Sequence, residues 1–177
     1  MYADVLRDPA FFRFLLRIDE EFAVEARRGG CRHCGGPLHV ADFPRKPRGC
    51  PPAVVEEYSW RFSFTCGRCD ARTTSRSVRF LDRRVYVAVV LMLAAPRGRA
   101  ARQLGDQLNV AMRTLERWRR WWREEFLRTP LWQAARSRFM PPLVSAQLPL
   151  ALLDRFEAEY PNDRLAQALR FLSPLSH

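Results

Sequence analysis

Two pairs of cysteines are the residues of this 177-residue chain best suited to chemistry. Cys31 and Cys34 form one C-x2-C pair, and Cys66 and Cys69 form another, with 31 residues between the pairs. A C-x2-C turn lets two thiolates face one metal ion while nearby backbone amides donate to the sulfurs. Two such turns supply the four sulfurs of a tetrahedral zinc site and leave no open coordination position. We therefore predict a bound zinc ion with a structural rather than a catalytic role.

Three other interpretations of these cysteines can be weighed. Disulfides require an oxidising compartment, and the first residues do not resemble a signal peptide, so we do not expect them. A thioredoxin-type pair expects a βαβ context, which the sequence lacks. An iron–sulfur centre stays an alternative, because four thiolates also bind iron. The fifth cysteine, Cys50, is expected to be a free thiol; the alternative is that it replaces one of the four ligands.

A second pattern, apolar residues at the spacing of two crossing helices, lies between residues 99 and 127. We predict helices over 99–108 and 112–127, with Asn109 in the turn, since Asn tolerates a left-handed backbone conformation. The side chains expected to be buried between them are Ala101, Leu104, Leu108, Val110, Leu115 and Trp118. The pattern predicts a helix-turn-helix, and the alternative is an ordinary helical hairpin with a basic face.

The second of these helices carries arginines three and four residues apart, which places them on one face. The first turns of such a helix enter the major groove of DNA, where arginine reaches guanine edges and phosphates. The DNA contacts that we predict there are Met112, Arg113, Arg117, Arg119, Arg120 and Arg123. We add the basic loop residues Arg45, Lys46 and Arg48, and we expect Trp118 and Trp122 to be buried.

The charge of the chain is concentrated in its central part. The net charge is +11, and residues 27–128 hold 22 basic against 9 acidic residues, a net +13. Such a segment is the electrostatic signature of a protein that binds a polyanion. Only one of the 30 basic residues is Lys, which a GC-rich genome would also produce. No run of about 18 uncharged apolar residues is present, so we expect no membrane helix.

The remaining sequence predicts elements on both sides of the cysteines. A helix over 8–28 begins at Asp8, ends at Gly29-Gly30, and exposes an acidic face that includes Asp19. Alternation over 58–65 predicts a strand with Tyr58, Trp60, Phe62 and Phe64 on its apolar face. Further predicted elements are a strand over 72–80, a helix over 83–95, and short helices over 150–160 and 162–172.

The predicted fold class is α+β: a small zinc ribbon with few antiparallel strands, a helix-turn-helix bundle and flanking helices. We divide the chain into an N-terminal helix (1–30), a four-cysteine ribbon with a basic loop (31–81), a helix-turn-helix (82–128) and C-terminal helices (129–177).

The stretch from Arg61 through the second cysteine pair to Tyr86, followed by the predicted helix-turn-helix, resembles the N-terminal region of zinc-ribbon insertion-sequence transposases. In that family a zinc ribbon precedes a helical unit that recognises the ends of the element. The resemblance covers about residues 31–125, and matches the four cysteines to the ribbon ligands and Arg113 and Arg117 to the recognition helix. Those transposases continue into a catalytic domain, but only about 50 residues follow here, too few for an ordinary domain.

These observations together predict a zinc-stabilised DNA-binding protein of mobile-element type that is not an enzyme and has no catalytic residues. We expect it to act in the cytoplasm with the nucleoid, with a transposase or recombinase as a partner, and homodimer formation stays open. The alternatives are a protein-docking subunit of a recombination or transcription complex, an RNA binder, and a small nuclease that uses C-terminal carboxylates such as Asp154.

Overall fold

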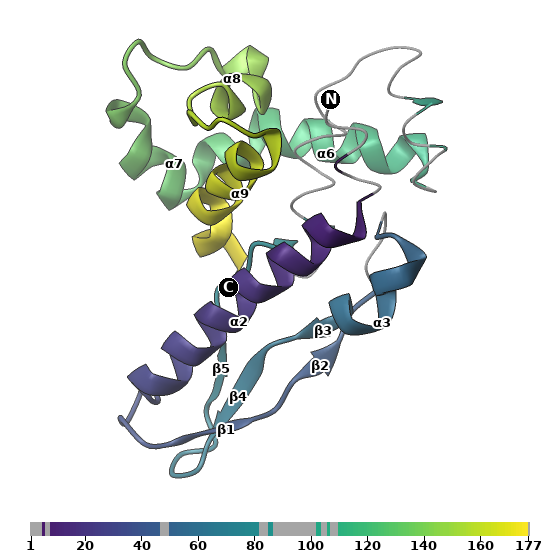
Figure 1. The fold of residues 1–177 in the computed structure, drawn as a ribbon. Coiled ribbons are helices and arrows are strands. Elements are labelled where there is room, and N and C mark those ends of the chain that lie inside the picture. The colour runs from purple at the N-terminus through teal and green to yellow at the C-terminus, as the bar shows by residue number, and fades with distance from the viewer. Residues whose placement is uncertain are drawn as a thin grey trace.

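A computed structural model describes residues 5, 8–46, 50–81, 85–86, 102–103, 106 and 110–176. The protein combines helices with small antiparallel sheets, which confirms the α+β class (Figure 1). The main helices are α2 (Pro9–Gly29), α3 (Val55–Tyr58), α6 (Met112–Glu124), α7 (Pro130–Ala135), α8 (Leu150–Leu153) and α9 (Pro161–Leu172). The 3-10 turns are Pro52–Val54, Phe126–Arg128, Arg136–Arg138, Ser145–Gln147 and Ser173–Ser176. The strands are β1 (Leu38–Val40), β2 (Phe43–Pro44), β3 (Trp60–Arg61), β4 (Ser63–Cys66), β5 (Arg72–Thr74), β6 (Phe80–Leu81) and β7 (Val85–Tyr86).

Helix α2 forms where the sequence predicts it. The side chain of Asp8 accepts a hydrogen bond of 2.9 Å from the backbone N–H of Ala10, and Pro9 fits the first turn. Gly30 ends the helix in a left-handed conformation with φ of 70°, which favours glycine. The apolar face, with Phe11, Phe12, Leu15, Ile18 and Phe22, is buried. This long helix therefore packs against the rest of the protein along most of its length.

The cysteine-containing segment forms a three-stranded antiparallel sheet in the order β1–β4–β5. Its register pairs Leu38 with Cys66 and Phe64 with Thr73. Two smaller ladders pair β2 with β3 and β6 with β7. Since Val85–Tyr86 is a strand, the predicted helix over 83–95 is wrong at these two residues, and the rest of it lies outside the described residues.

The predicted strand over 58–65 is shorter in the structure, and two of its side chains lie on the faces opposite to those predicted. Tyr58 belongs to α3, and the strand is divided into β3 and β4. Trp60, predicted on the apolar face, is 45% exposed, whereas Arg61 is buried. The reason is that the Arg61 guanidinium donates to the backbone oxygens of Ser75 and Ser176, which turns this side chain inward. Because neighbouring strand residues point to opposite faces, Trp60 then points outward.

One large hydrophobic cluster joins α2 to the helices that follow the sheet. It combines Phe12 and Leu15 with Tyr58, Trp118 and Leu169. A second, smaller cluster lies beside the cysteine turns and consists of Cys31, Leu38, Phe64 and Cys66. The predicted helix over 162–172 is confirmed by α9, whereas the one over 150–160 is reduced to the single turn α8. The larger core thus includes residues from all four predicted segments of the chain.

Candidate metal centre and basic helix

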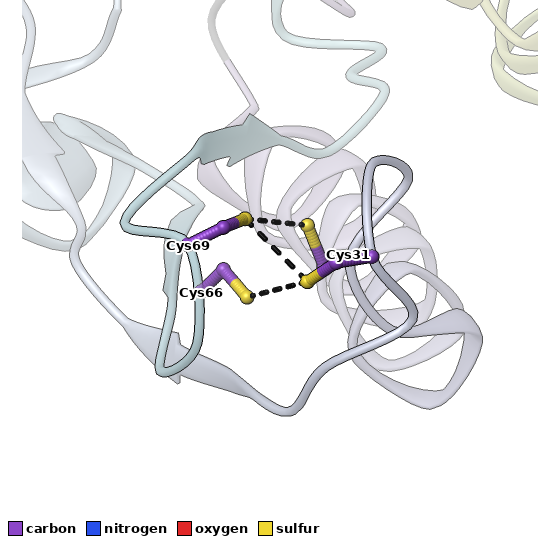
Figure 2. Close-up of side chains that lie close together, drawn as sticks. Cys31, Cys66 and Cys69 are labelled. Atoms are coloured by element: carbon purple, nitrogen blue, oxygen red, sulfur yellow. Dashed lines mark hydrogen bonds between the residues drawn. The ribbon is translucent and has the colours of Figure 1, made fainter.

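The sulfurs of the four predicted ligands converge at one point, next to the C-terminal end of α2. The Sγ atoms of Cys31, Cys34, Cys66 and Cys69 all lie within 4.8 Å of one another. The Sγ atoms of Cys31 and Cys69 are 3.6 Å apart, and the Sγ atom of Cys34 is 3.5 Å from those of both Cys66 and Cys69. Figure 2 shows the side chains of Cys31, Cys66 and Cys69 directed toward a common centre. These four residues can therefore hold a metal ion.

The first cysteine turn has a defined hydrogen-bond pattern. The N–H of Gly35 donates to the carbonyl of Cys31 at 2.8 Å, and the N–H of Cys31 donates to the carbonyl of Gly36 at 3.0 Å. The N–H of His33 points at the Cys31 sulfur at 3.4 Å. Gly35 adopts φ of 68°, in the left-handed region. The chain therefore folds back on itself so that both sulfurs of the pair face the same side.

The second cysteine turn repeats this pattern residue by residue. The N–H of Asp70 donates to the carbonyl of Cys66 at 3.1 Å, and the N–H of Cys66 donates to the carbonyl of Ala71 at 3.0 Å. The N–H of Arg68 points at the Cys66 sulfur at 3.3 Å. Asp70, at the position equivalent to Gly35, is also left-handed, with φ of 56°. Two turns of the same geometry thus present four sulfurs from opposite sides, as a tetrahedral site requires.

The two thiols of the second cysteine turn, Cys66 and Cys69, differ in pKa. Hydrogen bonds from the backbone N–H groups of Arg68 and Cys69 lower the pKa of the Cys66 thiol to about 6. For Cys69 a backbone hydrogen bond at Ala71 acts in the lowering direction, but hydrogen bonds with Cys34 and Cys31 raise its pKa to about 12. The pKa values of the two thiols of the second turn are therefore shifted in opposite directions. A divalent cation would replace the thiol protons, because a coordinating thiol is deprotonated outright.

The donor set fits a thiophilic metal. Thiolates select zinc and iron over magnesium or calcium. A tetrahedral ion with metal–sulfur bonds of about 2.3 Å sets neighbouring sulfurs about 3.8 Å apart. The distances from the Cys31 sulfur to the Cys69 sulfur, and from the Cys34 sulfur to the Cys66 and Cys69 sulfurs, are 3.5 to 3.6 Å, close to that value. All four donor atoms of this cluster are sulfurs, as a site for such a metal requires.

Cys50 is separate from this cluster. It packs against the larger hydrophobic core and its thiol lies 3.7 Å from the carbonyl oxygen of Pro51. Burial raises the pKa of Cys50 to about 12, against a smaller lowering effect of Arg79. The four converging sulfurs do not include it.

The predicted recognition helix is α6, and it presents two distinct faces. Its buried side carries Thr114, Leu115, Trp118 and Trp122, so the predicted burial of both tryptophans is confirmed. Its outer side carries the exposed residues Arg113, Glu116, Arg117, Arg120, Arg123 and Glu124. Met112 and Arg119, which we also predicted to contact DNA, are partly buried at the edges of these faces. The three arginines at 113, 117 and 120 have no acidic partner within the part of the chain that the structure describes.

The other predicted nucleic-acid contacts are only partly described. Arg45 is partly buried over the ring of Phe43, and Lys46 is exposed, whereas Arg48 lies outside the described residues. The first predicted helix of the helix-turn-helix also lies mostly outside them; Arg102, Gln103 and Asp106 are helical and exposed.

The cysteine cluster and α6 do not form one contiguous site. Figure 1 shows α6 close to the N-terminal end of α2, whereas Cys31 follows the C-terminal end of α2. A helix of 21 residues is about 30 Å long. The central basic segment thus contributes to two surfaces of the molecule.

A buried polar network is the feature that sequence reasoning missed. Asp19, expected on a solvated acidic face, is fully buried and pairs with Arg79 at 2.8 Å. The oxygen that binds Arg79, Oδ2, also accepts from the hydroxyl of Ser77, and Oδ1 accepts from the backbone N–H of Val78 at 2.7 Å. The only signal in the sequence was the helical position of Asp19, one residue after the buried Ile18.

Two further residues of the predicted acidic face form ion pairs. Glu25 binds Arg76 at 3.0 Å, and Glu21 binds Arg170 at 3.1 Å. Both guanidinium groups also lie over the ring of Phe22, at 4.5 and 5.7 Å from its centroid. Glu25 therefore connects α2 to the segment after β5, and Glu21 connects it to α9.

Among the described residues, none of the helices has the length and apolar character needed to cross a membrane. Comparisons with protein-family models, with curated proteins and with solved structures find no significant match to this chain.

Proposed function

We propose that this protein is a non-catalytic DNA-binding protein in which the four cysteines bind a structural zinc ion and α6 reads duplex DNA. The observation that carries the proposal is the exposed arginine stripe of α6, formed by Arg113, Arg117 and Arg120. It lies opposite a face anchored in the core by Trp118 and Trp122.

The geometry of α6 suits the major groove. An α-helix fits into the major groove of B-form DNA, and arginine donates two parallel hydrogen bonds to guanine. The buried tryptophans fix the orientation of the helix, so the arginines are held on an outward-facing surface rather than on a mobile loop. Duplex RNA is a weaker candidate, because its major groove is deep and narrow.

The assignment of zinc rests on the four sulfur donors and on the size of the cluster around them. Within the part of the chain that the structure describes, the buried residues of the apolar core beside the cysteines are Cys31, Leu38, Phe64 and Cys66. So small a core does not stabilise a fold without a further link, which structural zinc provides. A transposase-related origin of this ribbon-like unit is part of the proposal and rests on the resemblance of its sequence.

A docking role through the acidic face of α2 is less well supported. Glu21 and Glu25 are already paired with arginines of the same chain. A partner would have to displace both ion pairs.

Selection of bound DNA from a random pool, followed by fluorescence anisotropy, tests the proposal. Arg113→Ala with Arg117→Ala should weaken binding to the selected duplex by more than about tenfold, since each bidentate arginine–guanine contact contributes about 1–3 kcal/mol. The salt dependence should also become shallower for each phosphate contact that is lost. The matched control is Arg136→Ala with Arg138→Ala, two exposed arginines outside α6, which should change affinity little. Unchanged DNA binding by a folded α6 variant would refute the proposed role of this helix.

A further inference from the structure

Trp60 is exposed because of the way its strand is oriented, and its side chain is not packed in the core. In β3 the side chain of Arg61 points inward, where it donates to the backbone oxygens of Ser75 and Ser176. Trp60, the neighbouring residue in this strand, therefore points to solvent and is 45% exposed. The other four tryptophans, Trp118, Trp121, Trp122 and Trp132, are buried or partly buried in the large core. Trp60 is thus the tryptophan that contributes least to packing.

The backbone around Trp60 is held on both sides. Its own carbonyl accepts a hydrogen bond of 2.7 Å from the guanidinium of the buried Arg79. The carbonyl of Ser59 accepts a bond of 2.7 Å from the backbone N–H of Arg45. Arg79 is itself fixed by the ion pair with Asp19. The indole ring is therefore presented by a rigid strand.

The strand opposite Trp60 brings an apolar residue, followed in the chain by two cationic ones, to this part of the surface. Pro44 lies directly opposite it in the β2–β3 ladder and is exposed, and side chains at such paired positions are about 5 Å apart. Arg45 and the exposed Lys46 follow Pro44 in the chain. The acidic residues nearest in sequence are Glu56 and Glu57 of α3, and Glu57 is paired with Arg13. The surface therefore joins a flat aromatic ring to positive charge.

We propose that Trp60, with Pro44 and Lys46, forms a stacking platform for an unpaired base of a nucleic acid. Aromatic side chains next to cations bind single strands in this way, because every base offers a π-face and every nucleotide a phosphate. The platform lies on a different element from α6, and the inference does not depend on duplex recognition by that helix. It gives the protein a means to contact frayed or single-stranded DNA, or single-stranded RNA.

The test measures binding of single-stranded probes to the full chain. Oligodeoxythymidylate and oligouridylate of about 12 nucleotides are titrated by anisotropy and by quenching of tryptophan fluorescence. Trp60→Ala should weaken binding about tenfold, and Lys46→Ala should lower affinity and salt dependence together. Trp60→Phe should keep much of the affinity but lose the quenching. The comparison of the two probes shows whether DNA or RNA is preferred.

Tyr160→Ala is the matched control, because Tyr160 is also exposed but is preceded by Glu159 and followed closely by Asp163. The affinity of the Tyr160→Ala variant for the probes should equal that of the original protein. Thermal unfolding verifies that each variant is folded. Equal affinities of the original protein and of folded Trp60→Ala, or the absence of any binding by the original protein, would overturn the inference. Loss of duplex binding in the α6 variants, with unchanged single-strand binding, would separate the two surfaces.

Discussion

Asp19 of α2 and Arg79, which lies 60 residues further along the chain, form an ion pair of 2.8 Å with both side chains fully buried. The guanidinium of Arg79 also donates to the carbonyl oxygens of Tyr58 and Trp60, each at 2.7 Å. It lies about 5 Å from the ring centroids of Tyr58, Phe62 and Phe80. This ion pair thus connects α2 to the segment around Arg79 and, through the two carbonyl oxygens, to the end of α3 and to β3.

Substitution of Asp19 should be strongly destabilising. Asp19→Asn leaves the buried charge of Arg79 without its counter-ion, so we expect the free energy of unfolding to fall by about 3–5 kcal/mol. Urea unfolding monitored by circular dichroism measures this change. Glu21→Gln, which removes the exposed ion pair with Arg170, is the control and should cost less than about 1 kcal/mol. A comparable loss for the two variants would contradict the assigned role of the buried pair.

Metal removal should unfold the cysteine-containing sheet selectively. We expect the small cluster around Leu38 and Phe64 to depend on a metal ion held by the four cysteines, whereas α2 and α9 belong to the larger core. After chelation, hydrogen exchange should accelerate over residues 31–40 and 63–74 and change little in α9. Cys66→Ser should have the same effect, while Cys50→Ser should still bind one zinc ion per chain in a chromogenic zinc assay. Full protection of both segments in metal-free protein would argue against a structural ion.

The equivalent left-handed positions of the two cysteine turns should respond in opposite directions to substitution. Gly35→Ala places a side chain at φ of 68° and should cost about 1 kcal/mol, although nothing lies within 4 Å of the added carbon. Asp70→Gly relieves the same restriction at φ of 56° and should be neutral or stabilising. Thermal unfolding of the zinc-loaded variants measures both effects. Stabilisation by Gly35→Ala would show that the turns do not share this conformation.

Cys50 should be unreactive and should link stability to alkaline pH. Burial raises its pKa from 9.0 to about 12, so almost no thiolate is present at pH 8. Alkylation by iodoacetamide should therefore be at least about a hundredfold slower than for an exposed thiol. Because the folded pKa exceeds the unfolded value, its contribution to stability is complete below pH 9 and is lost as the pH rises toward 12. Cys50→Ala should remove this part of the pH dependence, and rapid labelling of the folded protein would contradict the burial.

The parts of the fold that depend on local signals could be predicted from the sequence. Asp8 and Gly30 bound α2 because capping and left-handed turns act over a few residues. The spacing of the cysteines predicted their convergence, since a C-x2-C turn is itself local. The helical period placed Trp118 and Trp122 on the buried face of α6 for the same reason.

The parts that depend on distant partners could not be predicted. Arg61 and Asp19 are polar residues that the local pattern assigns to solvent, but both are buried because their hydrogen-bond partners come from remote segments. The exchange of Trp60 and Arg61 between the two faces of β3 follows from those partners. No periodicity within 58–65 contains that information.

The hydrogen bond from Arg61 to the carbonyl of Ser176 spans 115 residues of the chain. A ribosome adds about 5–20 residues per second, so these two groups are synthesised on the order of ten seconds apart. During that interval the first cysteine pair, the second pair and β3 have all emerged while the acceptor for Arg61 does not yet exist. The cysteine turns can capture metal early, but the segment that links them to the helical core reaches its final arrangement only after residue 176 has been translated.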